Sequence, residues 1–226
     1  MNAQIGISVQ HIFIDGLSSD DTLDVIRKSA QANSMIVSEA DLGIYDAMNK
    51  GLALATGDVI GILNGDDYYS GDSVLRRIAD SFKASNSECV FGNVDFFNAD
   101  NPHKVVRRYN SGSFTPRRLT MGLMPAHPAT FFRRAVYEKC GKFKIDYKIA
   151  ADFEFLVRVF GVHKTQFIYL PEVLVRMQAG GASTRGIKSK WVLNREILRA
   201  LRENGLTANP LLLAAKIPFR LLELVR

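Results

Sequence analysis

Residues 41–69 combine an amphipathic helix, an apolar strand and an acidic loop, and this combination narrows the possible folds more than any other stretch. Ile44, Met48 and Leu52 recur at helical spacing, which predicts a helix of roughly three turns. Residues 58–63 form a short β-branched apolar run, typical of a strand buried on both faces in a parallel sheet. We therefore expect an α/β protein.

The predicted strand ends at Asn64-Gly65-Asp66-Asp67. Ligands of open α/β sheets bind at the carboxyl ends of the strands, so the acidic pair lies where a site is expected. Two adjacent carboxylates raise each other's pKa unless a cation neutralises them, and a divalent metal shared with substrate phosphates is a common solution. A solvated turn, with Asp67 capping the next helix, is the other interpretation.

The elements before residue 88 alternate regularly, and those after it do not. The pattern up to residue 63 predicts strand, helix, strand, helix, strand in a doubly wound arrangement with right-handed crossovers. Antiparallel pairing is expected beyond residue 88, where two apolar runs flank a hairpin-type connection. Strands are predicted at residues 9–14, 34–38, 58–63, 88–97, 104–109, 128–133, 166–170 and 173–177, and helices at 22–30, 44–55, 74–82, 135–139, from 150, and through most of the last forty residues.

Composition predicts a globular protein with one core, since 47% of the 226 residues are hydrophobic. Residues 185–226 carry nine basic and three acidic side chains, which account for the whole net charge of +6. The basic character thus belongs to a tail, and we expect no nucleic-acid partner. We expect a cytoplasmic location, because no signal peptide or membrane-spanning run is found. Cys89 and Cys140, far apart in sequence, are expected to be reduced and buried.

Three further side chains have both a structural and a functional interpretation. Asp15 ends a predicted strand beside Gly16, where it either forms a turn or contacts a ligand. Asp152 begins a helix between apolar neighbours, as a cap or as a general base with a tuned pKa. His127, between Ala126 and Pro128, is on its own typical of a structural histidine.

The helix over residues 44–55 also carries Tyr45, Asn49 and Lys50. A lysine at this position either faces a diphosphate or is solvated. Residues 180–185 form a glycine-rich segment that is either a loop closing on phosphates or a linker.

The tail predicts two helices. Ile187, Trp191, Leu198 and Leu201 form a stripe in the first, and residues 211–225 are apolar around most of the second. The pair either packs on a body formed by residues 1–184, or residues 185–226 form a basic amphipathic anchor for the anionic inner face of the plasma membrane.

Taken together, the motifs resemble bacterial family 2 glycosyltransferases of the GT-A fold. The resemblance extends over roughly residues 8–185 and is specific, because several motifs occur in the same order and spacing. The segments that carry it are residues 14–22, 38–51, 55–58, 63–68, 127–131 and 150–155.

The resemblance implies a GT-A-like nucleotide-diphospho-sugar transferase fold, with a mixed sheet flanked by helices. It implies inverting transfer from a nucleotide-sugar donor to a sugar or lipid-linked acceptor, with Mn²⁺ or Mg²⁺, in surface polysaccharide or glycolipid biosynthesis. Asn64 replaces the first acid of the family's metal motif, which removes one charge. By this resemblance Asp152 is the general base, Asp66 is the metal ligand and His127 lies on the acceptor side. Asp15 binds the donor through its nucleobase, and the other implied donor-binding residues are Tyr45, Asn49, Lys50, Asn64 and Asp67.

The resemblance also has a departure. Members of the family usually begin with a further strand and helix, whereas here Met1 falls a few residues before the first predicted strand. We therefore expect a sheet that lacks a central strand and exposes unpaired backbone. This departure leaves a second functional hypothesis, an inactive remnant that binds a nucleotide sugar or a protein partner.

Overall fold

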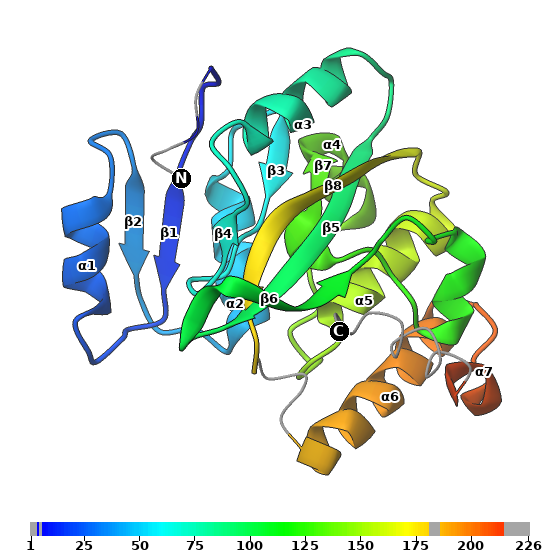
Figure 1. Cartoon of the computed structure of the whole chain (residues 1–226). Coiled ribbons are helices and arrows are strands. Elements are labelled where there is room, and N and C mark those ends of the chain that lie inside the picture. The colour runs from blue at the N-terminus through cyan, green and yellow to red at the C-terminus, as the bar shows by residue number, and fades with distance from the viewer. Residues whose placement is uncertain (1–3, 5, 181–185, 215–226) are drawn as a thin grey trace.

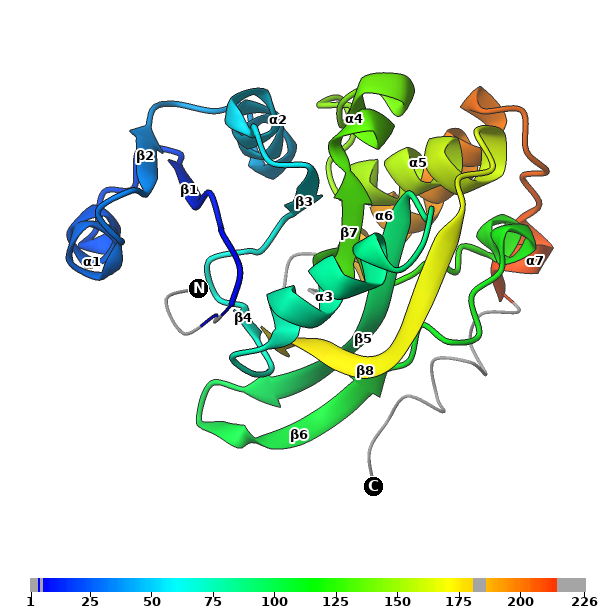
Figure 2. The same ribbon diagram turned by 90° about the horizontal axis from the view of Figure 1, so that it is seen from above.

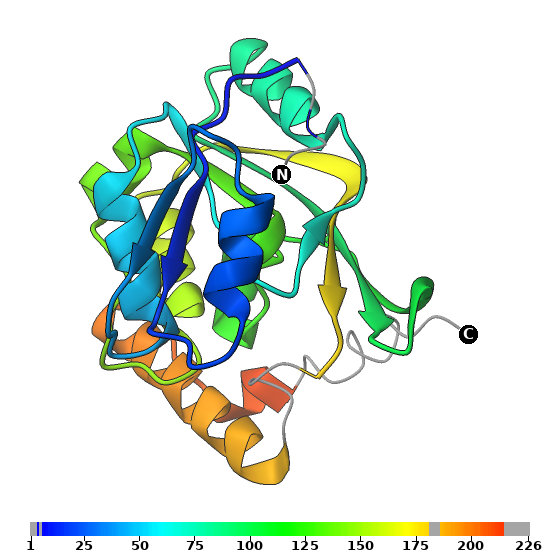
Figure 3. The same cartoon turned by 90° about the vertical axis from the view of Figure 1, so that its left-hand side faces the viewer.

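The computed structural model describes residues 4, 6–180 and 186–214, and its strands fall into two groups (Figure 1). The first group is a parallel pair, β1 (Ile12–Asp15) and β2 (Met35–Ser38). The helices α1 (Thr22–Ser29) and α2 (Ile44–Leu54) lie on opposite sides of this pair (Figures 2 and 3). This strand–helix–strand–helix order agrees with the sequence prediction.

The second group is a six-stranded mixed sheet that curls strongly (Figure 2). Its central strand, β5, pairs antiparallel with β7 and β6 along one side and parallel with β8 along the other. Beyond β7 lies β3, and beyond β8 lies the short β4. The strands are β3 (Val59–Gly61), β4 (Tyr68–Tyr69), β5 (Cys89–Asn98), β6 (Asn101–Tyr109), β7 (Thr130–Arg133) and β8 (Phe167–Gln178).

The prediction of one doubly wound sheet is wrong at β3. This strand pairs antiparallel with β7, makes no ladder with β1, and buries only Ile60. The carbonyls of His11 and Asp15 accept backbone hydrogen bonds from the β2 side. Because backbone groups alternate in direction along a strand, the N–H and C=O groups of Ile12 and Ile14 point to the other edge of β1. The described strands therefore form two separate sheets, and no ladder joins β1 to β3.

Four smaller differences from the predicted elements are local. The hairpin of β5 and β6 is confirmed, but β6 begins three residues earlier than predicted. The strands predicted at 166–170 and 173–177 are one strand, β8, with irregular register between its halves. Pro128 lies in a 3₁₀ turn, so β7 begins only at Thr130. The helix α5 (Ala151–Leu156) continues as a π-helical turn, Val157–Val162.

The remaining helices cover the six-stranded sheet. Residues of α3 (Val74–Lys83) pack in one apolar cluster, and α4 (Arg134–Cys140), α5 and α6 (Gly186–Glu203) share a second, larger one. The second cluster is rich in aromatic rings: Phe132 is fully buried against Tyr137, Phe155 and Phe160. The two cysteines are free and buried within this cluster, which confirms their prediction.

The described part of the tail packs on the body. Ile197, Ala200 and Leu201 of α6, with Leu213 of α7 (Pro210–Ala214), are buried in the larger cluster. Most of the second predicted tail helix, and the segment 181–185, lie outside the described residues. Among the residues described, no helix is both long and apolar enough to cross a membrane.

Replacing Phe132 tests the aromatic cluster. Phe132→Ala removes a fully buried ring that contacts three others, and we expect the free energy of unfolding to fall by about 3–5 kcal/mol. Val25→Ala, on the exposed face of α1, is the control and should change it by less than about 0.5 kcal/mol. Urea denaturation measures both, and equal losses would contradict the assignment of the core.

Candidate active site

Asp152 lies in the first turn of α5, between the buried residues Ala151 and Phe153. Its Oδ1 accepts the Phe153 N–H at 2.7 Å and lies 3.5 Å from the Tyr45 hydroxyl. Burial raises the pKa of this carboxyl, while the nearby His127 and the backbone N–H groups act in the opposite direction. A partly exposed carboxylate with a raised pKa has the properties of a general base.

His127 and Tyr45 complete the surroundings of Asp152. Burial lowers the pKa of His127, with Asp152 opposing, and its ring meets the Phe143 ring edge-on at 5.5 Å. Tyr45 is buried at the start of α2, and its hydroxyl donates to the Ile149 carbonyl. The structure thus gathers these three predicted site residues, although their roles stay predictions.

The other α2 candidates are engaged within the protein. Asn49 donates to the Phe143 carbonyl at 2.8 Å and accepts the Phe143 N–H at 2.9 Å, so its amide bridges α2 to the loop before α5. Lys50 pairs with Glu39 at 2.9 Å and donates to the Ala40 carbonyl at 2.6 Å. Neither contact includes the acidic loop, and donor binding by these two residues stays a prediction.

The acidic loop follows β3 and leads into β4. Asn64 Nδ2 donates to Asp67 Oδ2 at 2.9 Å. Burial, with a contribution from Asp66, raises the pKa of Asp67 to about 6 although the Asn64 bond opposes it. Asp67 Oδ1 is buried and has no hydrogen-bond partner, whereas Asp66 is exposed. Asp67 does not cap a helix, since α3 begins seven residues later after Ser73.

Asp15 ends β1 and joins it to β2. Its carboxylate accepts the Ser18 hydroxyl and N–H and, at 2.7 Å, the Ser38 hydroxyl. These bonds, the Ser18 hydroxyl foremost, lower the pKa of Asp15 despite its burial. Asp15 is only 5% exposed, and its hydrogen bonds fix the ends of β1 and β2 relative to each other. Its contact with a nucleobase stays a prediction.

Sequence reasoning missed Glu196 of α6. Its carboxylate accepts the backbone N–H groups of Lys148, Ile149 and Ala150 at 2.7, 2.9 and 2.9 Å. The Ile149 carbonyl in turn accepts the Tyr45 hydroxyl, so α6 fixes the loop that leads directly to Asp152. The only signal in the sequence is an acid next to Ile197, on the face of the helix that packs on the core.

Removing the charge of Glu196 tests this clamp. Glu196→Gln leaves one oxygen acceptor where three N–H groups converge, and we expect a loss of about 1.5–3 kcal/mol in the free energy of unfolding. The matched control is Glu138→Gln, on the surface of α4, with an expected change within about 0.5 kcal/mol. A tolerated Glu196→Gln would show that the loop is held by its other contacts.

Comparisons with known protein sequences find glycosyltransferases. Two curated relatives are the PGL/p-HBAD biosynthesis glycosyltransferase of Mycobacterium bovis, 30% identical over 81% of this chain and 71% of its own length, and the hyaluronan synthase of Pasteurella multocida, 30% identical over 84% of this chain and 20% of its own length.

Solved structures show the same fold. TarS of S. aureus with UDP-GlcNAc superposes with a TM-score of 0.68 at 16% identity, over 91% of this chain. The mannosyltransferase PcManGT of Pyrobaculum calidifontis with GDP-Man and Mn²⁺ gives 0.63 at 19% identity, over 95% of this chain. This chain spans 62% of each of those chains. Both likenesses identify the fold as GT-A.

The family model described as glycosyl transferase family 2 matches residues 3–141, which is more than half of the chain. Together with relatives at 30% identity over most of the chain, this match assigns the sequence independently of the structure. The chain belongs to glycosyl transferase family 2.

Proposed function

We propose that the protein transfers a sugar from a nucleotide-sugar donor to an acceptor hydroxyl with inversion at the anomeric carbon. The observation that carries this proposal is the surroundings of Asp152: a carboxylate of raised pKa next to His127 and Tyr45, in the first turn of α5. Two structural neighbours were solved in complex with UDP-GlcNAc and with GDP-Man, which supports a nucleotide-sugar donor.

The acidic loop fits a divalent cation. Asp66 is exposed, and the buried Oδ1 of Asp67 has no hydrogen-bond partner, so each residue has carboxylate oxygen to offer a hard cation. Among the described residues no group of three His, Cys, Asp or Glu side chains could hold a metal alone. We therefore assign Mn²⁺ or Mg²⁺ to Asp66, with Asp67 beside it and donor phosphates as further ligands. When bound, such an ion neutralises charge on the leaving diphosphate.

The roles of the protein's own residues follow from their contacts. Asn64 holds one oxygen of Asp67 and so fixes the direction of the other. Asp152 accepts the proton of the acceptor hydroxyl while the hydroxyl oxygen attacks the anomeric carbon on the face opposite the diphosphate. His127 is buried near this carboxylate, and burial lowers the pKa of its ring while Asp152 acts in the opposite direction. Inversion follows from a single in-line displacement.

The biological setting is a proposal drawn from relatives. The names of two of them mention PGL/p-HBAD biosynthesis and hyaluronan. We place this chain in surface polysaccharide or glycolipid synthesis, acting in the cytoplasm, with the basic tail facing an anionic inner leaflet when the acceptor is membrane-bound.

Replacing Asp152 tests the general base. Asp152→Asn cannot accept a proton, and we expect the rate of sugar transfer to fall by about 10²–10⁴-fold with donor binding retained. In the wild type, transfer should decline as pH falls, with a midpoint above the ordinary aspartate pKa, because burial raises the pKa of Asp152. Asp80→Asn, on the exposed side of α3, is the control. Undiminished transfer by Asp152→Asn would refute this role.

Replacing Asp66 tests the metal site. Asp66→Asn removes an exposed carboxylate, and we expect Mn²⁺-dependent affinity for UDP or GDP to fall by about tenfold or more, measured by isothermal titration. Asp24→Asn, exposed on α1, should bind as the wild type does.

The same titration separates the two functional hypotheses. The divided sheet between β1 and β3 is the observation that favours an inactive remnant. Wild-type protein that binds neither nucleotide with Mn²⁺ would support a remnant that binds a protein partner and contradict the proposed donor site.

A further inference from the structure

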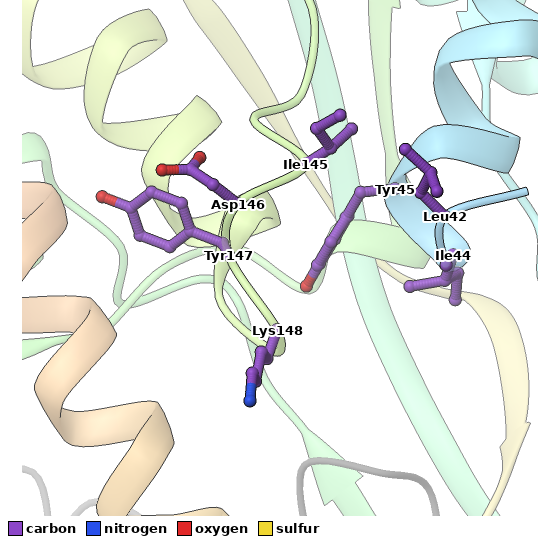
Figure 4. A pocket seen from close by; sticks show the side chains of 8 residues that line it. Leu42, Ile44, Tyr45, Ile145, Asp146, Tyr147 and Lys148 are labelled. Atoms are coloured by element: carbon purple, nitrogen blue, oxygen red, sulfur yellow. The ribbon is translucent and has the colours of Figure 1, made fainter.

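A pocket of about 420 Å³ opens between the start of α2 and the loop before α5. Residues 42–45 line one side and residues 145–148 the other, and Figure 4 shows the Tyr45 ring between them. We call this cavity the Tyr45 pocket. Its volume lies in the range of sites for small organic groups.

Both walls of the Tyr45 pocket are fixed by polar contacts. Glu196 binds the backbone of residues 148–150, and Glu203 accepts the Tyr147 hydroxyl at 2.9 Å. Arg199 pairs with Asp146. On the α2 side, Asn49 bridges to Phe143 through two hydrogen bonds. The pocket is therefore preformed, and a ligand would not have to order it.

The lining combines apolar side chains with polar and charged ones, among them Asp146, which pairs with Arg199. Leu42, Ile44 and Ile145 are 78%, 52% and 48% exposed, so three large apolar side chains of the lining are in contact with solvent. Lys148 also lines the pocket and is exposed, and it has no ion pair within the described parts of the chain. An apolar group carrying a nearby anion is the ligand that complements this surface.

Tyr45 connects the pocket to the candidate base. Its hydroxyl donates to the Ile149 carbonyl and lies 3.5 Å from Asp152 Oδ1, while its ring forms part of the pocket lining. Asp152 itself does not line the pocket, so a molecule in the pocket contacts Tyr45, and its hydroxyl would have to extend past this side chain to reach the carboxylate. The pocket shares none of its lining residues with the acidic loop after β3.

We propose that the Tyr45 pocket binds the acceptor, and that this acceptor is an amphiphile: an apolar chain or ring lies against Leu42, Ile44 and Ile145, and an anionic group next to it pairs with Lys148. The inference rests on the proposed function, since it assigns the acceptor side of the same reaction. A small free sugar would leave the three apolar side chains in water and Lys148 unpaired.

Binding of a matched pair of probes tests the proposal. Octyl phosphate, kept below its micelle concentration, contains both features, whereas methyl phosphate contains only the anion. Isothermal titration of the full chain should show octyl phosphate binding at least about tenfold more tightly than methyl phosphate. Equal affinities would overturn the assignment of an apolar ligand.

Variants locate the binding. Ile44→Ser and Lys148→Gln should each weaken octyl phosphate binding by about fivefold or more, while the controls Val25→Ser and Lys28→Gln on α1 should leave it unchanged. An Ile44→Ser protein that binds octyl phosphate as tightly as Val25→Ser does would refute the site.

Nucleotide titration of the same samples separates this inference from the proposed function. Ile44→Ser and Lys148→Gln should bind UDP or GDP with Mn²⁺ as the wild type does, which also shows that they are folded. If the wild type binds octyl phosphate and methyl phosphate equally but still binds the nucleotide, the acceptor assignment is overturned and the proposed transferase function is not. Absence of nucleotide binding in the wild type would count against the transferase itself and, with it, against an acceptor pocket.

Discussion

The buried carboxylate of Glu196 is the contact on which the arrangement around Asp152 depends. It gathers three consecutive backbone N–H groups of the loop before α5, and hydrogen bonds between N–H groups and a charged acceptor are among the stronger ones in proteins. The Ile149 carbonyl of this loop accepts a hydrogen bond from the Tyr45 hydroxyl and so fixes the position of Tyr45. Asp152, two residues beyond the last bound N–H, thereby receives a defined position. The α6 helix thus positions the loop that leads to the candidate base.

Two chemically different halves follow from this organisation. The acidic loop lies at the carboxyl end of β3, where an exposed Asp66 and a buried Asp67 suit a cation and phosphates. The proposed base, Asp152, lies on α5, in an environment of aromatic and aliphatic side chains, and burial there raises its pKa. One half offers two neighbouring carboxylates to a cation, and the other surrounds a single carboxylate with apolar side chains. A transferase needs this contrast, because it must stabilise an anionic leaving group while it keeps a carboxylate ready to accept a proton.

The sequence allowed the local elements and most candidate residues to be predicted, because helical spacing in α2 and the β-branched run before Asn64 are short-range signals. Family motifs added the expected role of Asp152, whose surroundings come from residues such as Tyr45, 107 positions away. The pairing of β3 with β7 was missed, since an apolar run does not encode its partner strand. Glu196 was missed for a related reason: its partners are backbone groups about 46 to 48 residues earlier, which no motif marks.

The central claim is that the acidic loop and Asp152 act on the same bound donor. A crystal structure of the protein with Mn²⁺ and the nucleotide that titration shows to bind tests it most directly. The account predicts metal density bridging Asp66 and the diphosphate, with the end of the diphosphate that carries the sugar directed toward Asp152 and the Tyr45 pocket left open for an acceptor. A nucleotide bound away from the loop after β3, or a diphosphate directed away from Asp152, would contradict it.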